Sequence, residues 1–158
     1  MNKAQAQNSS LFLSKEGVWK FDGVEITHAR TLEVLRKNLH RCEEGIYVQI
    51  GREQSWVEVE DTIYFVSSVD GTPENGFQLT LSDKTQEDLN PSSLRYKPER
   101  LVCRVKEGTE EARFLRGPYH DILQHLIEDD MGYSLQIKGE KIHLLHYPVP
   151  FPDLDKRS

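Results

Sequence analysis

Two stretches of this chain repeat one pattern: GIYVQIGREQSWVEV at residues 45–59 and GYSLQIKGEKIHLL at residues 132–145. Each opens on a glycine, carries a Gln-Ile pair at the same place, and holds a charged turn between apolar runs. Gly45 and Gly132 are 87 positions apart (132 − 45), and so are Ile50 and Ile137. The repeat predicts that one supersecondary unit occurs twice.

The residues before the first stretch contain a hairpin signal and a helix signal. Apolar and polar residues alternate about Asp22-Gly23, which is typical of a tight β-hairpin turn. In residues 29–45, leucines recur at helical spacing and Gly45 ends the pattern. We therefore expect strand, strand and helix to precede the two strands of residues 45–59.

The second copy has the same order. LVCRV (101–105) and EEARFL (110–115) alternate as strands, and apolar residues of 118–130 recur at helical spacing before Gly132. The sequence thus predicts an α+β fold of two tandem strand–strand–helix–strand–strand units, an internal duplication. The second unit is enlarged by a hairpin between residues 63 and 81, and residues 83–98 are expected to form a loop.

These patterns predict the division of the chain. We expect an N-terminal α+β unit at residues 11–61 and a C-terminal unit at 62–147, with tails at 1–10 and 148–158. The apolar face of each element predicts a set of buried residues: Trp19, Leu35, Leu39, Val48, Phe114, Ile122, Leu126, Leu135 and Ile137.

Composition and charge limit the partners. The 158 residues have a net charge of −6, whereas a protein that grips duplex nucleic acid needs surplus Lys and Arg. There is no run of about 18 apolar residues for a membrane span and no apolar signal stretch near the N-terminus. We expect a cytoplasmic protein that binds neither duplex nucleic acid nor membrane, with Cys42 and Cys103 as reduced thiols.

No catalytic or metal-binding motif occurs. His143 and His146 point to opposite faces of a strand, and no Gly-x-Ser-x-Gly or phosphate-binding glycine loop is present. We expect no metal and no cofactor. An enzyme of unrecognised class stays open, but the sequence favours a binding protein.

One local charge pattern suggests a binding site. Residues 95–116 hold seven cations and four acids, while residues 43–61 hold six acids and one arginine. We expect an anion site, if one exists, to use Arg104 and Arg113 on one face of a hairpin, with Arg116 and Tyr119 at the next helix. Guanidinium groups suit phosphate, and a tyrosine ring could stack on a base. Alternatively, the arginines pair with Glu111 and Tyr119 belongs to the core.

Three segments resemble the bacterial domain of unknown function 1285 family: GVWKFDGVEI (17–26), EQSWVEVED (53–61) and EARFLRGPYHDIL (111–123). The resemblance spans residues 17–145. It implies a duplicated α+β fold whose C-terminal half is like a pleckstrin-homology sheet or open barrel. It also implies a ligand site at the junction of the halves and a role in signalling.

Two functions therefore compete. The first is a sensor of a small phosphorylated or nucleotide-like ligand in bacterial signalling, with its site between the two units. The alternative is a protein–protein interaction module without a small-molecule ligand.

Overall fold

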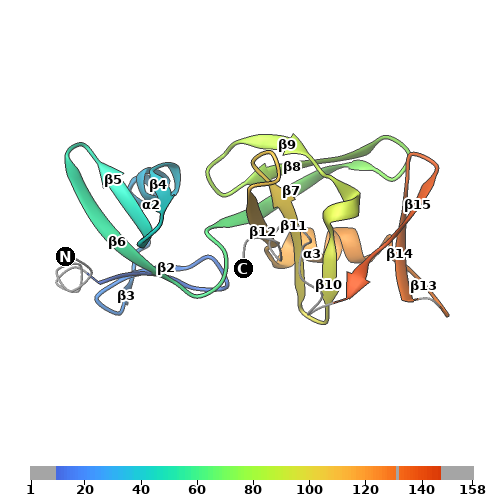
Figure 1. Ribbon diagram of the computed structural model, residues 1–158, viewed down its shortest axis with the longest axis horizontal. Coiled ribbons are helices and arrows are strands. Elements are labelled where there is room, and N and C mark those ends of the chain that lie inside the picture. Colours follow the sequence, from blue (N-terminus) through green and yellow to red (C-terminus); the bar gives the residue numbers. More distant parts are fainter. Residues whose placement is uncertain (1–9, 131, 147–158) are drawn as a thin grey trace. The chain divides into compact units, whose positions relative to one another are not determined.

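The computed structural model describes residues 10–130 and 132–146 (Figure 1). The chain divides into two compact units, Met1–Ile63 and Tyr64–Ser158, which are called here the N-terminal and C-terminal units. The tails predicted at 1–10 and 148–158 lie outside the described residues except for Ser10.

In its described residues, 10–63, the N-terminal unit has a six-stranded mixed sheet and one helix. Its sheet order is β3-β2-β1-β6-β5-β4, and β1 runs parallel to β6 and antiparallel to β2. The sequence pattern did not predict β1, which joins the hairpin β2–β3 to the meander β4–β5–β6. The elements are β1 (Leu11–Leu13), β2 (Trp19–Phe21), β3 (Val24–Glu25), α2 (Ala29–Lys37), β4 (Leu39–Cys42), β5 (Gly45–Ile50) and β6 (Glu53–Val59).

The first hairpin turns at Asp22-Gly23, as the sequence predicts. Phe21 pairs with Val24 across the two-residue turn, so the sequence pattern located this turn correctly. Trp19 is buried at 2% exposure, but Phe21 and Val24 are 44% and 70% exposed. The apolar pair at the hairpin end therefore lies on the surface.

The first helix is shorter than predicted. It begins at Ala29, after His28 accepts a hydrogen bond from the Thr31 N–H, and it ends at Lys37. Asn38 stops it, because its backbone N–H bonds back to Leu35 O and its side chain to Val34 O. Leu39, expected as a helical residue, is instead the first residue of β4.

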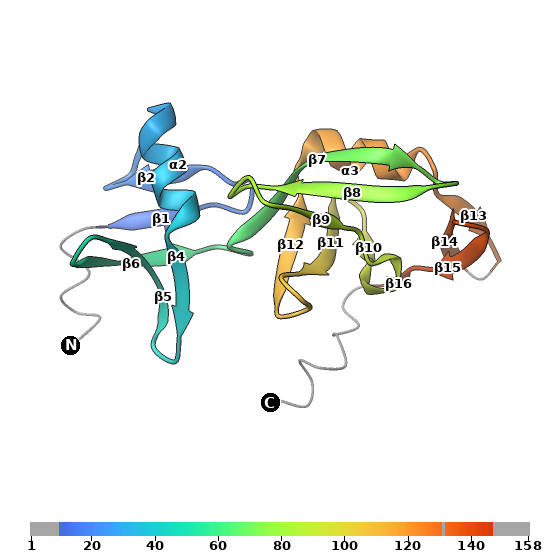
Figure 2. The ribbon, with the colours of Figure 1, turned by 90° about the horizontal axis from the view of Figure 1, so that it is seen from above.

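The C-terminal unit combines an open seven-stranded sheet, a helix and a three-stranded sheet. The orders are β16-β10-β11-β12-β7-β8-β9 and β13-β14-β15. α3 contacts β7, as Figure 2 shows. The elements are β7 (Tyr64–Thr72), β8 (Gly76–Leu81), β9 (Gln86–Asp88), η1 (Pro91–Ser93), β10 (Arg95–Lys97), β11 (Arg100–Val105), β12 (Glu110–Phe114), α3 (Arg116–Leu123), β13 (Ile127–Asp129), β14 (Gly132–Ile137), β15 (Glu140–His143) and β16 (Leu145–His146).

The prediction that residues 83–98 form a loop is wrong. This segment contains β9, the 3-10 turn η1 and β10, and it buries Leu89, Leu94 and Tyr96. Two prolines and many polar residues suggested a loop, but Pro91 lies in η1 and Pro98 in the turn after β10, and the polar residues of β9 suit an edge strand. The apolar residues spaced among them are what anchor the segment to the core.

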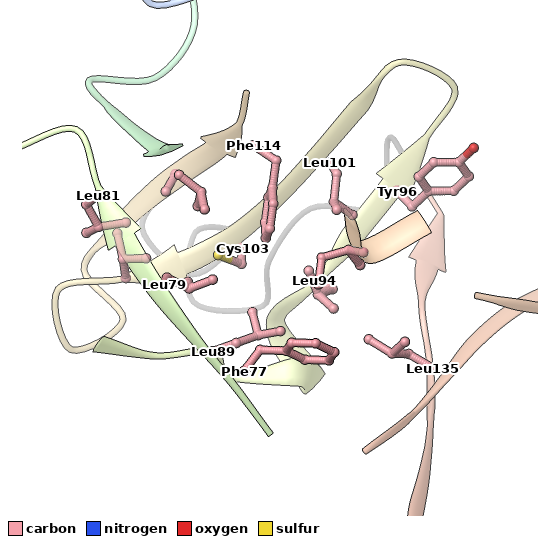
Figure 3. Packing of buried hydrophobic residues seen from close by; sticks show 14 of the residues in the cluster. Phe77, Leu79, Leu81, Leu89, Leu94, Tyr96, Leu101, Cys103, Phe114 and Leu135 are labelled. Carbon is pink, nitrogen blue, oxygen red and sulfur yellow. The ribbon is translucent and has the colours of Figure 1, made fainter. Parts of the chain in front are cut away.

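One apolar core serves both sheets of the C-terminal unit. Cys103 and Leu101 of β11 are completely buried, and Leu135 of β14 and Ile122 of α3 belong to the same cluster. Figure 3 shows Leu79 and Leu94 beside Cys103 within this cluster. The burial of Cys103 as a free thiol agrees with the prediction.

The predicted duplication is confirmed by element order and register. Each unit runs hairpin, helix and three-stranded meander. The closing pairs of the two turns in each meander are displaced by the same 87 positions: Cys42–Gly45 and Ile50–Glu53, Asp129–Gly132 and Ile137–Glu140. The helices also match, because Leu35 and Ile122 are both buried.

The copies differ in how their sheets are joined. In the N-terminal unit, β1 links hairpin and meander into one sheet, whereas β13–β14–β15 is a separate sheet. The second helix is also followed by a strand, β13, where a continuing helix was predicted. A superposition of Leu32 on Tyr119 and Ile50 on Ile137, and the likeness to a pleckstrin-homology barrel, stay predictions.

Eight of the nine residues expected in the core are buried, and Leu126 is the exception. It lies beyond the end of α3 and is half-buried against the cluster. The helical period that placed it on the core face ends at Leu123.

A lysine fastens the β11–β12 turn to the β8–β9 turn. Lys106 Nζ lies 2.7 Å from Asp83 Oδ2 and 3.0 Å from Thr85 Oγ1, and 4.9 Å above the Tyr64 ring centre. Burial raises the pKa of Asp83, but hydrogen bonds from Lys106 and Thr85 outweigh it and hold the pKa below its ordinary 3.8. The ionised carboxylate is therefore favoured in the folded chain.

We expect Asp83→Asn to flatten the acid dependence of stability. Because the folded pKa lies below the unfolded value of 3.8, the Asp83 contribution is complete above that value and is lost as pH falls through the folded pKa. Urea unfolding between pH 7 and pH 3 measures it. At pH 7 the free energy of unfolding of the variant should be lower than that of the wild type by roughly 1 kcal/mol. The two free energies should converge as the pH falls. A gap at pH 3 as large as the gap at pH 7 would mean that shape, not charge, is responsible.

Candidate functional site

The structure puts Arg104 and Arg113 on one face of the β11–β12 hairpin, as their alternation predicts. Arg104 is opposite Glu111, and Arg113 is opposite Val102. Their guanidinium groups donate hydrogen bonds to different carbonyl groups. Arg104 donates from Nε and Nη2 to Gly108 O, within the turn that follows β11.

Arg113 and Tyr119 meet at the other end of β11. Arg113 Nη2 donates to Glu99 O at 3.3 Å, and the Glu99 N–H donates to the Tyr119 hydroxyl at 2.7 Å. Glu99 has a φ of 68°, a conformation that ordinary side chains adopt at a cost of about 1–2 kcal/mol. The two side chains therefore hold a strained turn between β10 and β11.

Arg116 is the first residue of α3 and is exposed. The four residues expected to form an anion site are thus distributed between two ends of a hairpin, and Arg113 and Tyr119 share Glu99 as a bonding partner. Glu111 is the alternative partner for the arginines. Its Oε1 lies 4.0 Å from Arg100 Nη2. Anion binding by these residues stays a prediction.

Three tyrosines cluster beside this turn. The Tyr96 ring centre lies 6.5 Å from that of Tyr119 and 5.1 Å from that of Tyr133. Burial, followed by the hydrogen bond with Tyr119, raises the pKa of Tyr96 to about 12. Figure 3 shows its hydroxyl pointing away from the apolar residues. A phenol with this pKa stays neutral at physiological pH, so it can exchange hydrogen bonds but is a poor base.

Complete burial raises the pKa of the Cys103 thiol, and the nearby charges of Glu87 and Glu111 raise it further. Since the thiolate is the nucleophile, this cysteine is inert.

The C-terminal unit contains a cleft that the sequence analysis did not predict. Its volume is about 600 Å³, which is within the usual range for small-molecule sites. Buried Phe77, Leu89 and Ile137 contribute apolar surface. The lining comes from β7, β8, the segment from β9 to η1, and β14–β15: Asp70, Gly71, Asn75, Gly76, Phe77, Gln78, Asp88, Leu89, Asn90, Pro91, Ser92, Ile137, Lys138, Glu140 and Ile142.

Three polar lining residues form a rung across neighbouring strands. Asp70 pairs with Gln78, and Gln78 pairs with Asp88, so the three side chains share one face of β7, β8 and β9. Directly paired residues have Cβ atoms about 5 Å apart. Two carboxylates and an amide therefore lie side by side on the strand face opposite that of Phe77 and Leu89, and all five residues border the cleft.

The β14–β15 turn also lines the cleft and supplies a cation. The Lys138 N–H donates to Pro73 O at 2.8 Å, which ties this turn to the β7–β8 turn. A Cβ at Gly76 would come within 2.8 Å of Lys138 Cε, so the absence of a side chain there makes room for the lysine. With Glu140 beside it, the cleft lining holds three carboxylates and one ammonium group.

The cleft was missed because its parts are far apart in the sequence, and one of them lies in the segment expected to be a loop. The matching charges of Asp70 and Asp88 become neighbours only through strand pairing. A possible signal was Gly71 and Gly76 bounding one turn, which indicates close backbone approach.

Within residues 10–130 and 132–146, no group of three or more His, Cys, Asp or Glu residues is placed to hold a metal ion. The helices of that same part are too short or too polar to cross a membrane.

Two solved structures share this fold, whereas no family model and no curated protein sequence matches the chain. The crystal structure of a DUF1285 family protein from Silicibacter pomeroyi DSS-3 has a TM-score of 0.66 and 15% identity, covering 86% of this chain and 79% of that one. A DUF1285 family protein from Shewanella baltica OS155 gives a TM-score of 0.56 and 14% identity, covering 73% and 91%. The chain therefore has the fold of DUF1285 proteins, as the sequence resemblance implied.

Proposed function

We propose that this protein binds a small polar ligand that carries a positive charge, in the cleft of its C-terminal unit. The observation that carries the proposal is the cleft itself, whose lining contains both carboxylates and apolar side chains. Such a combination suits an ammonium or guanidinium group attached to a compact organic body. Lys138 could meet a carboxylate or hydroxyl at the other end of the same molecule.

A phosphorylated or nucleotide-like ligand fits this cleft less well, because three carboxylates against one lysine repel an anion. That ligand class depends on Arg104, Arg113, Arg116 and Tyr119 and stays a prediction, as does a sensing role in bacterial signalling. The alternative, a protein-interaction module, is supported by a surface of the N-terminal unit described below.

A thermal-shift panel separates these ligand classes. Amino acids, polyamines and amino sugars form one arm, and nucleotides and phosphorylated sugars form the other. A ligand at 100 times its Kd stabilises the folded state by about 2.7 kcal/mol, which is readily measured. We expect a compound of the first arm to raise the melting temperature.

Two tryptophan variants test whether the rise in melting temperature comes from binding in the cleft. Ser92→Trp should fill the cleft and abolish the shift, while Gln124→Trp, at an exposed position outside the lining, should leave it intact. Should the shift survive Ser92→Trp, the cleft is not the site. A nucleotide shift that disappears in the double variant Arg113→Ala, Arg116→Ala would instead assign binding to the arginines.

A further inference from the structure

Three aromatic rings form a continuous row across the N-terminal sheet. His40, Tyr47 and Trp56 are direct cross-strand neighbours on β4, β5 and β6. The His40 and Tyr47 rings stack with centres 5.3 Å apart at 26°, and the Tyr47 and Trp56 rings meet edge to face at 5.9 Å and 75°. We call these three residues the aromatic row.

The aromatic row lies on the sheet face opposite the core. Val48 and Val57, which each follow a row residue by one position, are buried. Since successive strand residues point to opposite faces, the row faces away from them. His40 is exposed, and Tyr47 and Trp56 are half-buried. Cross-strand aromatic pairs stabilise a sheet by about 0.2–1 kcal/mol each.

Carboxylates border the row on one side. Glu58 follows Trp56 by two residues and therefore shares its face, and it is exposed. Cys42 is likewise two residues beyond His40, and its Sγ donates to Glu44 Oε1 at 3.4 Å, which brings a second carboxylate to this edge. Between them, Gly45 places no side chain beside Tyr47.

This arrangement matches a guanidinium group. Its flat face stacks on aromatic rings, and its N–H groups pair with carboxylates. The stretch 43–61, with six acids and one arginine, repels phosphate and attracts a cation. The row extends over three neighbouring strands, so it suits side chains presented by an extended segment of a longer chain.

We propose that the aromatic row, with Glu44 and Glu58, docks arginine side chains of an extended segment of a partner protein. This proposal does not depend on the cleft. The rings of the row supply the stacking surface, and the two glutamates supply the charge and the hydrogen-bond acceptors.

The test is an NMR titration of the full chain with acetyl-(Arg-Gly)3-amide. We expect saturable shifts of the Gly45 amide and the Trp56 indole. A peptide with citrulline for arginine keeps the shape but removes the charge, and it should bind at least ten-fold more weakly. Glu58→Gln should weaken binding ten-fold, whereas Glu53→Gln should not, because Glu53 is also exposed but lies on the opposite face.

Three results would overturn the proposal. The first is no saturable shift at Gly45 or Trp56. The second is equal weakening by Glu58→Gln and Glu53→Gln, which indicates diffuse charge attraction. The third is binding of arginine amide alone as tightly as the peptide, which would mean a small-molecule site. Tyr47→Leu, checked for unchanged unfolding, should lose the peptide without losing the fold.

Discussion

Replacing Ile122 by alanine should lower the free energy of unfolding of the C-terminal unit by about 2–5 kcal/mol. Ile122 is completely buried on α3 and belongs to the cluster shared by both sheets of that unit. Removing most of its side chain loses apolar burial and leaves a cavity among the side chains of this cluster. Urea unfolding followed by circular dichroism measures the loss.

Leu126→Ala is the matched control, since it removes a similar side-chain volume four residues later in the chain, beyond the end of α3. Leu126 is only half-buried, so its loss should be roughly 1–2 kcal/mol, in proportion to the apolar area it covers. Equal losses at the two positions would contradict the end of α3 at Leu123 and would restore the longer helix that the leucine spacing predicted.

That longer helix is the most instructive error of the sequence analysis, because it occurs in both copies. The apolar spacing continues through Leu39 and Leu126, but the chain turns at Asn38 and at Gln124, and strands β4 and β13 follow. A short strand of alternating residues and the last turn of an amphipathic helix present similar patterns over three or four residues. The duplication was predictable because it requires only that two patterns agree, whatever their local structure.

The binding features were less predictable, for two reasons. The parity of a hairpin gives the face of Arg104 and Arg113, but the direction of a long side chain depends on which carbonyl it meets, here Gly108 and Glu99. The cleft rung of Asp70, Gln78 and Asp88 exists only after β7, β8 and β9 pair. Register between strands separated by turns of uncertain length cannot be read from composition.

Gly71→Ala should have an effect comparable to that of Ile122→Ala, by a different mechanism. Gly71 has a φ of 117°, and a Cβ there would lie 2.2 Å from Gly76 O and 3.1 Å from Phe77 Cα. The backbone conformation alone costs about 1–3 kcal/mol for an alanine. The clash is with main-chain atoms of the paired strand, which cannot rotate away. We expect a total loss of roughly 2–5 kcal/mol in chemical unfolding.

Gly139→Ala separates the two causes. Gly139 has a φ of 83°, but nothing lies within 4 Å of an added Cβ, so only the conformational cost of about 1–2 kcal/mol applies. A loss at Gly71 no larger than at Gly139 would mean that the β7–β8 strands separate easily.

Because Gly71 also lines the cleft, strands that the methyl group forces apart should widen the spacing of Asp70 and Gln78. Any ligand that stabilises the wild type through this cleft should then bind the Gly71 variant more weakly, whereas the Gly139 variant should keep its affinity.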